Sequence, residues 1–134
     1  MKQLLLFLSA SFMLTACGET CYNAPQPIAF KLVNANNENL ITNGMLTNYS
    51  VKEESQNTIQ LTKTSEDMLI LENVGAYNGT KNYAFTSNLR NFTFTIQSSE
   101  FKGGCDGYQI NKLTFTGIGI DVKDENGYYK IILE

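Results

Sequence analysis

Phe92-Thr93-Phe94-Thr95-Ile96 is the stretch that decides the fold class of this chain. Large apolar side chains alternate with threonines, and this period of two is typical of a β-strand with one buried and one exposed face. Threonine and phenylalanine also favour extended backbone, because their side chains pack well on a pleated surface. The stretch therefore predicts a strand that contributes one face to a hydrophobic core.

The same period of two recurs on both sides of this stretch. Near the start of the chain, Ile28, Phe30 and Leu32 alternate with Ala29 and its neighbours, and this pattern predicts another half-buried strand. Polar segments rich in Asn, Ser, Gly and Asp separate the apolar segments and are typical of turns. Strands are predicted at residues 28–33, 49–52, 57–62, 68–71, 82–87, 92–96, 108–116, 118–122 and 128–133.

Local irregularities refine this pattern. Asn126-Gly127 predicts a tight hairpin between the last two strands, because this dipeptide adopts positive φ without strain. The change of apolar spacing between Ile110 and Leu113 predicts a bulge. Eight or nine short strands at roughly ten-residue intervals predict an all-β fold. For residues 28–134 we expect a small antiparallel β-sandwich, immunoglobulin-like or related, with a small β-barrel as the alternative.

Composition restricts the chemistry of the chain. The net charge of −3 is spread without a basic stripe, which argues against nucleic-acid binding. The chain has no histidine, so Ser-His-Asp and Cys-His catalysis are excluded, and no CxxC spacing supports a metal site. We therefore expect no enzyme, no metal ion and no cofactor. Three acidic pairs fall in predicted turns, where solvated charges are common: Glu53-Glu54, Glu66-Asp67 and Asp124-Glu125.

The start of the chain has the layout of a secretion signal. Lys2 precedes an apolar run that is too short to cross a bilayer, and the run ends in Leu14-Thr15-Ala16-Cys17. This tetrapeptide resembles a bacterial lipobox. The resemblance implies that residues 1–16 are a lipoprotein signal peptide and that Cys17 receives a diacylglyceryl group and, on its new amine, an acyl chain such as palmitate. An ordinary signal peptide cut after Ala16 and a buried N-terminal strand are the alternatives.

The cysteine count agrees with such an anchor. If Cys17 carries lipid, Cys21 and Cys105 remain as a pair, and a disulfide between them suits an oxidising compartment. The bridge would close a loop of about 85 residues, which is worth on the order of 4 kcal/mol in the chain-entropy account. Two free thiols, or a Cys17–Cys21 pair in an unlipidated protein, are the alternatives. Residues 17–27, with Pro25 and Pro27, are expected to form an extended tether.

A second similarity covers most of the mature chain. Residues 25–33 and 38–44, the latter ending in Thr42-Asn43-Gly44, resemble the opening of small lipoproteins common in Bacteroidota. Those proteins also carry a late cysteine and a final hairpin, and the family has no assigned activity. By resemblance, Gly18 after the lipid cysteine implies the outer membrane rather than retention in the inner membrane. Whether the domain faces the periplasm or the cell surface is left open by the single Glu19 that follows.

The sequence leaves several functions to compare. Our leading hypothesis is a lipid-anchored cell-envelope protein with a non-catalytic binding or structural domain, whose protein or glycan partner is unknown. The alternatives are a glycan- or small-ligand-binding module of an outer-membrane uptake system, and an inhibitor or immunity-type lipoprotein. The side chains most suited to an interaction surface are five tyrosines, with burial at the sandwich edge as the ordinary alternative: Tyr77, Tyr83, Tyr108, Tyr128 and Tyr129.

Overall fold

A computed structural model describes residues 21–133 of the chain. The described residues form strands, turns and loops without a helix, so the predicted all-β class is confirmed. The signal peptide expected at residues 1–16 and the lipid site expected at Cys17 lie outside the described residues. The strands are β1 (Tyr22–Asn23), β2 (Ile28–Val33), β3 (Tyr49–Glu53), β4 (Thr58–Ile59), β5 (Leu61–Lys63), β6 (Leu69–Leu71), β7 (Gly79–Ser87), β8 (Phe92–Gly103), β9 (Cys105–Thr116), β10 (Ile120–Asp124) and β11 (Tyr129–Leu133).

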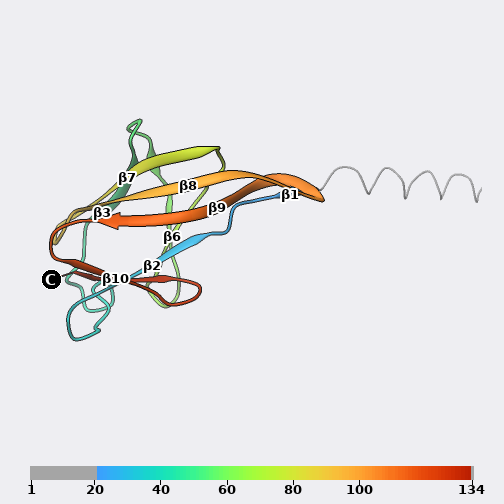
Figure 1. Cartoon of the computed structure of the whole chain (residues 1–134). Helices are drawn as coiled ribbons and strands as arrows, with labels where there is room; N and C mark the ends of the chain where they lie inside the picture. The colour runs from blue at the N-terminus through green and yellow to red at the C-terminus, as the bar shows by residue number, and fades with distance from the viewer. Residues whose placement is uncertain (1–20, 134) are drawn as a thin grey trace, which may run out of the picture.

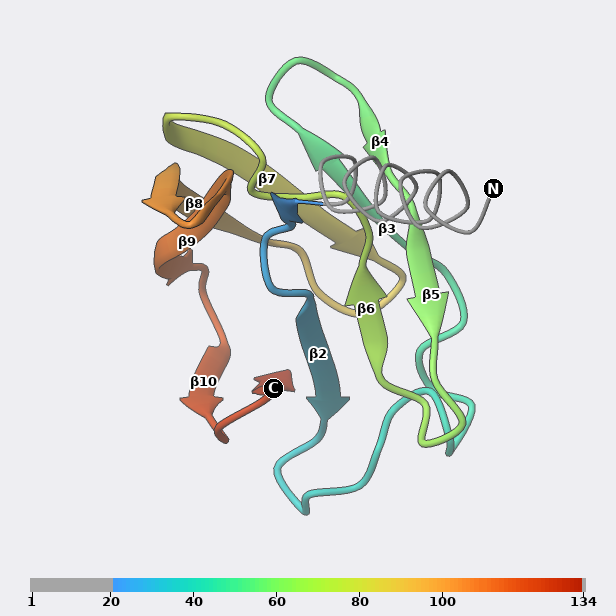
Figure 2. The same cartoon turned by 90° about the vertical axis from the view of Figure 1, so that its right-hand side faces the viewer.

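The strands form two sheets (Figures 1 and 2). The larger sheet has the order β1-β9-β8-β7-β3-β4, and the smaller sheet has the order β10-β11-β2-β6-β5. On one side, β4 and β5 are separated by Gln60 alone, so one short segment passes from the larger sheet to the smaller one. On the other side, the chain passes between the sheets through the short β9–β10 connection. One of the sheets is curled like half a barrel, which agrees with a small sandwich or barrel.

Aromatic side chains fill the space between the sheets. Phe30 on β2 meets Phe94 on β8 edge-on, with ring centres 5.3 Å apart, and Phe94 stacks on Tyr83 of β7 at 5.2 Å. Phe92, Phe94 and Ile96 are all buried, while Thr93 between them is exposed. The period of two in this stretch therefore marks the buried face of β8, as predicted. Such edge-on and offset aromatic pairs add stability beyond the burial of apolar area.

Two strand pairs are parallel, which the predicted antiparallel sandwich did not include. Strand β2 pairs with β11 in parallel, with Phe30 opposite Tyr129, and β1 pairs with β9 in parallel. The other pairs in both sheets are antiparallel. Alternating burial reveals which face of a strand is covered, but it carries no information about the neighbour to which the strand bonds. The order and direction of pairing therefore had no signal in the sequence.

The long β8–β9 ribbon contains the predicted bulge. Gln97 is opposite Lys112 and Ser98 is opposite Ile110, so Asn111 is the extra residue on β9. This position lies between Ile110 and Leu113, where the change of apolar spacing placed it. Each strand of the ribbon has 12 residues, which corresponds to a length of about 35–40 Å. Figure 1 shows the ribbon reaching beyond β2 at the end of the domain where β1 lies.

The hairpin at the end of the chain is also confirmed. Strands β10 and β11 are antiparallel, and the amide of Glu125 donates to the carbonyl of Tyr128 at 2.9 Å. The two residues at the tip, Asn126 and Gly127, have φ values of 56° and 132°. Both values are positive, as the primed turns of two-residue hairpins require.

The segment expected to be a tether is partly ordered on the domain. Residues 17–27 include β1, whose Tyr22 and Asn23 pair with Asp106 and Gly107 of β9. The folded domain described by the structure therefore begins before Ile28. A strand of two residues is too short to show a period of two, so no sequence pattern predicts it.

Candidate functional site

A disulfide closes one end of the domain. Cys21 is bonded to Cys105 across 84 residues of sequence, with a Cα–Cα distance of 4.9 Å. The pairing predicted from the cysteine count is therefore present in the structure. Because Cys105 opens β9 just after the tip of the β8–β9 ribbon, the bridge fixes the start of the described chain to that tip. We call this part of the molecule the disulfide end.

Strand β1 has two further attachments at the disulfide end. Its backbone pairs with β9, and the side-chain amide of Asn23 donates to the carbonyl of Cys105 at 2.7 Å. Gly107 is needed for this close approach, since a Cβ there would overlap the carbonyl oxygen of Asn23. The absence of a side chain at Gly107 thus lets β1 lie directly against β9.

Two shallow cavities flank β1 and share Phe101 and Tyr108 as lining residues. Their volumes are about 320 and 270 Å³. Tyr22, with 60% of its surface exposed, borders the smaller cavity. The other lining residues are Asn23, Gln26, Gln109 and Ile110 for the larger cavity, and Glu100, Lys102, Asp106 and Gly107 for the smaller one.

The opposite end of the domain is built from connecting loops and exposes aliphatic side chains. Met45, Leu89 and Ile118 lie in the β2–β3, β7–β8 and β9–β10 connections, with 55%, 38% and 90% of their surfaces exposed. Asn88 ties the first two loops together, because its amide nitrogen donates to the carbonyl of Met45 at 3.0 Å. Its amide oxygen also accepts hydrogen bonds from two backbone amides of the β2–β3 loop. We call this end, with Met45, Leu89 and Ile118, the loop end.

Two of the five candidate tyrosines belong to the core rather than to a surface. Tyr83 is only 3% exposed and donates its hydroxyl hydrogen to the Tyr77 hydroxyl at 3.3 Å. Tyr77 in turn donates to the carbonyl of Ile96 at 2.8 Å. Burial raises the pKa of both phenols above the usual value for tyrosine. At Tyr83 the structure therefore shows burial, the ordinary alternative for these tyrosines, because the position alternates onto the buried face of β7.

The other three tyrosines lie on one side of the sandwich. Tyr128 and Tyr129 line a third cavity, which has a volume of about 290 Å³. Tyr108 lines the larger cavity of the disulfide end. The two cavities share Gln26 and Ile110 as lining residues. Tyr129 is half-buried against Phe115, with ring centres 5.4 Å apart. Its pKa is raised mainly by burial and further by the charge of Asp124. Tyr108 therefore lines one cavity and Tyr128 and Tyr129 line its neighbour, and an interaction surface at these tyrosines stays a prediction.

The acidic pairs lie in turns or at strand ends, where they have structural partners. Glu53 is 2.9 Å from the ammonium of Lys81, and Glu125 is 3.5 Å from that of Lys130. Glu54 accepts a hydrogen bond from the side-chain amide of Asn82 at 3.1 Å. Within residues 21–133, no three His, Cys, Asp or Glu side chains come together as a candidate metal site.

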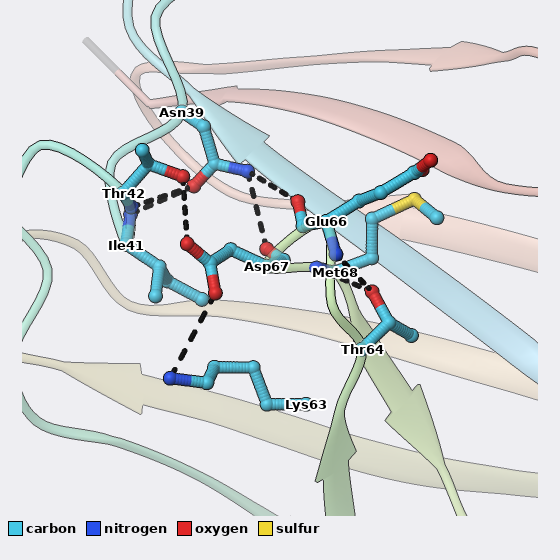
Figure 3. Close-up of polar contacts among 8 residues, drawn as sticks. All are labelled: Asn39, Ile41, Thr42, Lys63, Thr64, Glu66, Asp67 and Met68. Carbon is cyan, nitrogen blue, oxygen red and sulfur yellow. Dashed lines mark hydrogen bonds and ion pairs between the residues drawn. The ribbon is translucent and has the colours of Figure 1, made fainter.

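A polar network joins the β2–β3 loop to the β5–β6 turn (Figure 3). The side-chain amide of Asn39 donates to the carbonyls of Glu66 and Asp67, at 3.4 and 3.1 Å. Its amide oxygen accepts hydrogen bonds from the backbone amides of Ile41 and Thr42. The Thr42 hydroxyl donates to the Asp67 carboxylate at 2.8 Å. The sequence showed only polar turns here, because the contacts join segments more than twenty residues apart.

Comparisons with known proteins return no match: no protein-family model, no curated protein and no solved structure resembles this chain closely enough to be recognised. In the part of the chain that the structure describes, no helix is long and apolar enough to cross a membrane. The two ends of the domain and the sequence before it are the features of the chain that bear on its function.

Proposed function

We propose that the protein is a lipid-anchored, non-catalytic component of a bacterial cell envelope, held by acyl chains on Cys17, that binds another protein through its loop end. The observation that carries this proposal is that the two ends of the domain differ. The disulfide lies at one end of the β8–β9 ribbon, four residues after Cys17 in sequence, and the exposed aliphatic side chains lie at the other end.

The loop end suits protein binding for physical reasons. Met45, Leu89 and Ile118 expose aliphatic groups to water, and their burial against a partner is favourable by about 25 cal/mol per Å² of apolar surface. Rigid strands commonly present binding residues on loops in this way. Aliphatic side chains favour a protein partner over a glycan, because sugars stack on flat aromatic faces.

The anchor is supported by the lipobox-like Leu14-Thr15-Ala16-Cys17 and by the use of the other two cysteines in the disulfide. Each buried methylene contributes about 0.8 kcal/mol, so two or three acyl chains on one residue would hold the protein firmly. The outer membrane is the expected location, by resemblance to lipoproteins that lack Asp after the lipid cysteine.

Mass spectrometry of the intact protein extracted from membranes tests the anchor. We expect a chain without residues 1–16, with acyl chains at Cys17, that gains two hydrogens on reduction. A free thiol at Cys17 would overturn the anchor. Protease treatment of intact cells then determines whether the domain faces outward.

Crosslinking within the envelope tests the binding surface. A photoreactive side chain at Ile118, which is 90% exposed, is expected to capture one defined protein. The matched control places the same group at Lys52, which is exposed on β3 away from the loop end. Equal capture from both positions would contradict a role for the loop end.

A glycan- or small-ligand-binding module is the second candidate function. It is favoured by the cavity of about 290 Å³ that Tyr128 and Tyr129 line, since tyrosine combines a flat apolar ring with a polar tip. A glycan array with the wild-type protein and a Tyr128→Ala variant separates the two functions. Glycan binding by the wild-type protein that disappears in the variant would support the glycan-binding module. If the wild-type protein binds no glycan on the array, protein binding is favoured.

A further inference from the structure

We propose that the disulfide end of the domain rests on the lipid headgroups of the membrane, with Tyr22 and Phe101 in contact with them. The β8–β9 ribbon then stands away from the membrane and carries the loop end outward. This inference depends on the lipid anchor proposed above and adds the orientation of the domain.

The length of chain between Cys17 and Cys21 limits how far the disulfide end can lie from the anchored residue. Cys17 precedes Cys21 by four residues, and an extended chain spans at most about 3.6 Å per residue, so Cys21 lies within about 15 Å of a lipidated Cys17. Cys105 is bridged to Cys21 at a Cα–Cα distance of 4.9 Å. The tip of the β8–β9 ribbon is therefore held within about 20 Å of the anchored residue.

The attachment of β1 to the ribbon restricts how the domain can turn about its anchor. Without β1, residues 17–27 would be a flexible linker of ten peptide links, which is long enough to let the domain turn freely. Three contacts fix this linker to the ribbon from Cys21 onward: the disulfide, the β1–β9 pairing and the Asn23–Cys105 hydrogen bond. The domain is therefore attached through its disulfide end, and the linker is shortened to four residues.

The surface of the disulfide end carries aromatic side chains that suit lipid headgroups. Tyr22 is the exposed large hydrophobic residue of the disulfide end, whereas Met45, Leu89 and Ile118 all belong to the loop end. Phe101 lines both cavities beside it. Tyrosine is enriched at the headgroup level of membranes, because its ring is apolar and its hydroxyl remains hydrated.

Charge plays a minor part in this contact. The smaller cavity is lined by the basic Lys102 together with the acidic Glu100 and Asp106. The ammonium of Lys102 lies 3.8 Å from the Glu100 carboxylate, so this cation is already paired. We therefore expect contact with zwitterionic phosphatidylcholine bilayers, which have no net charge, as well as with anionic ones, and little dependence on salt.

Single tryptophans provide the test, because the natural chain contains none. The lipidated full chain is prepared as Tyr22→Trp, Phe101→Trp and, as the matched control, Ile118→Trp. Each variant is placed in phosphatidylcholine vesicles that contain brominated lipid. We expect strong quenching and a blue-shifted emission for the first two variants, and neither effect for the control.

The outcomes separate this inference from the proposed function. Mass spectrometry of the same samples reports whether Cys17 carries lipid, and its absence would overturn the anchor. If lipid is present and the tryptophans at positions 22 and 101 are not quenched, the orientation alone is wrong. Stronger quenching at position 118 than at position 22 would mean that the loop end faces the membrane.

Discussion

The hydroxyl of Tyr83 lies 3.3 Å from that of Tyr77, and the two phenols form a chain of hydrogen bonds that ends on the carbonyl of Ile96. This chain links β7, the loop before it and β8 inside the sandwich. At its outer side, the ammonium of Lys81 lies 4.6 Å from the centre of the Tyr77 ring. Burial disfavours the charged phenolate form of both tyrosines.

Alkaline pH is therefore expected to destabilise the domain. The folded-state pKa values of Tyr77 and Tyr83 are raised above 10.0, so the unfolded chain loses these protons first. The stability that these two phenols contribute should be constant below a pH of about 10 and be lost above it. A double variant, Tyr77→Phe with Tyr83→Phe, should weaken this fall, whereas Ile118→Ala, at an exposed position, should leave it unchanged. Urea denaturation across this range measures it, and an equal fall in all three proteins would contradict the assignment.

Removing the disulfide should lower stability substantially. A bridge across 84 residues is worth about 4 kcal/mol in the chain-entropy account. We expect the Cys21→Ser, Cys105→Ser double variant to lose most of this amount in urea denaturation. Reductant should have the same effect on the natural protein and none on the double variant. A natural protein that is indifferent to reductant would show that the bridge contributes little.

Gly107→Ala should detach β1 from β9, because the new methyl group overlaps the carbonyl of Asn23. Hydrogen exchange at the backbone amides of β1 should accelerate at least tenfold, while exchange in the core of β8 should change little. Asp106→Ala, on the neighbouring exposed position, is the matched control and should leave β1 protected. Protection that survives in Gly107→Ala would refute the close approach.

Phe94→Ala should remove a central part of the core. Phe94 is 1% exposed and packs against Phe30, Tyr83 and Phe115, with ring centres 5.2–5.9 Å away. We expect a loss of about 3–5 kcal/mol in the free energy of unfolding. Ile118→Ala removes an apolar side chain that is 90% exposed and should cost almost nothing. Similar losses in both variants would contradict the description of the core.

Asn39→Ala should release the β2–β3 loop from the β5–β6 turn. The substitution removes the amide oxygen that accepts from Ile41 and Thr42, and the amide nitrogen that donates to Glu66 and Asp67. We expect a loss of about 1–3 kcal/mol in urea denaturation. Asn36→Ala, on an exposed position of the same loop, should be near neutral. If the two variants behave alike, the network of Figure 3 is not stabilising.

The sequence predicted much of the local structure because each feature has a local cause. The alternation at residues 92–96 marked the buried face of β8, and the change of spacing between Ile110 and Leu113 marked the bulge at Asn111. Asn126-Gly127 marked the last hairpin through its tolerance of positive φ. The cysteine count indicated the Cys21–Cys105 pair.

The remaining features depend on contacts between distant segments. The amides of Asn39 and Asn23 find their partners 28 and 82 residues away, so no local pattern could indicate those hydrogen bonds. Tyrosine suits both the interior and the exterior, so the sequence alone leaves an interaction surface and burial open for Tyr77 and Tyr83. Only the neighbours that the fold supplies decide between the two.

The parallel pairing of β2 with β11 has a consequence for the order of events in the cell. Strand β11 provides the buried Ile131 and Leu133, and its partner β2 was synthesised about a hundred residues earlier. The smaller sheet cannot close around Phe30 until Leu133 has left the ribosome. The pairing of β2 with β11 therefore comes late, after the strands that lie between them in the sequence have been synthesised.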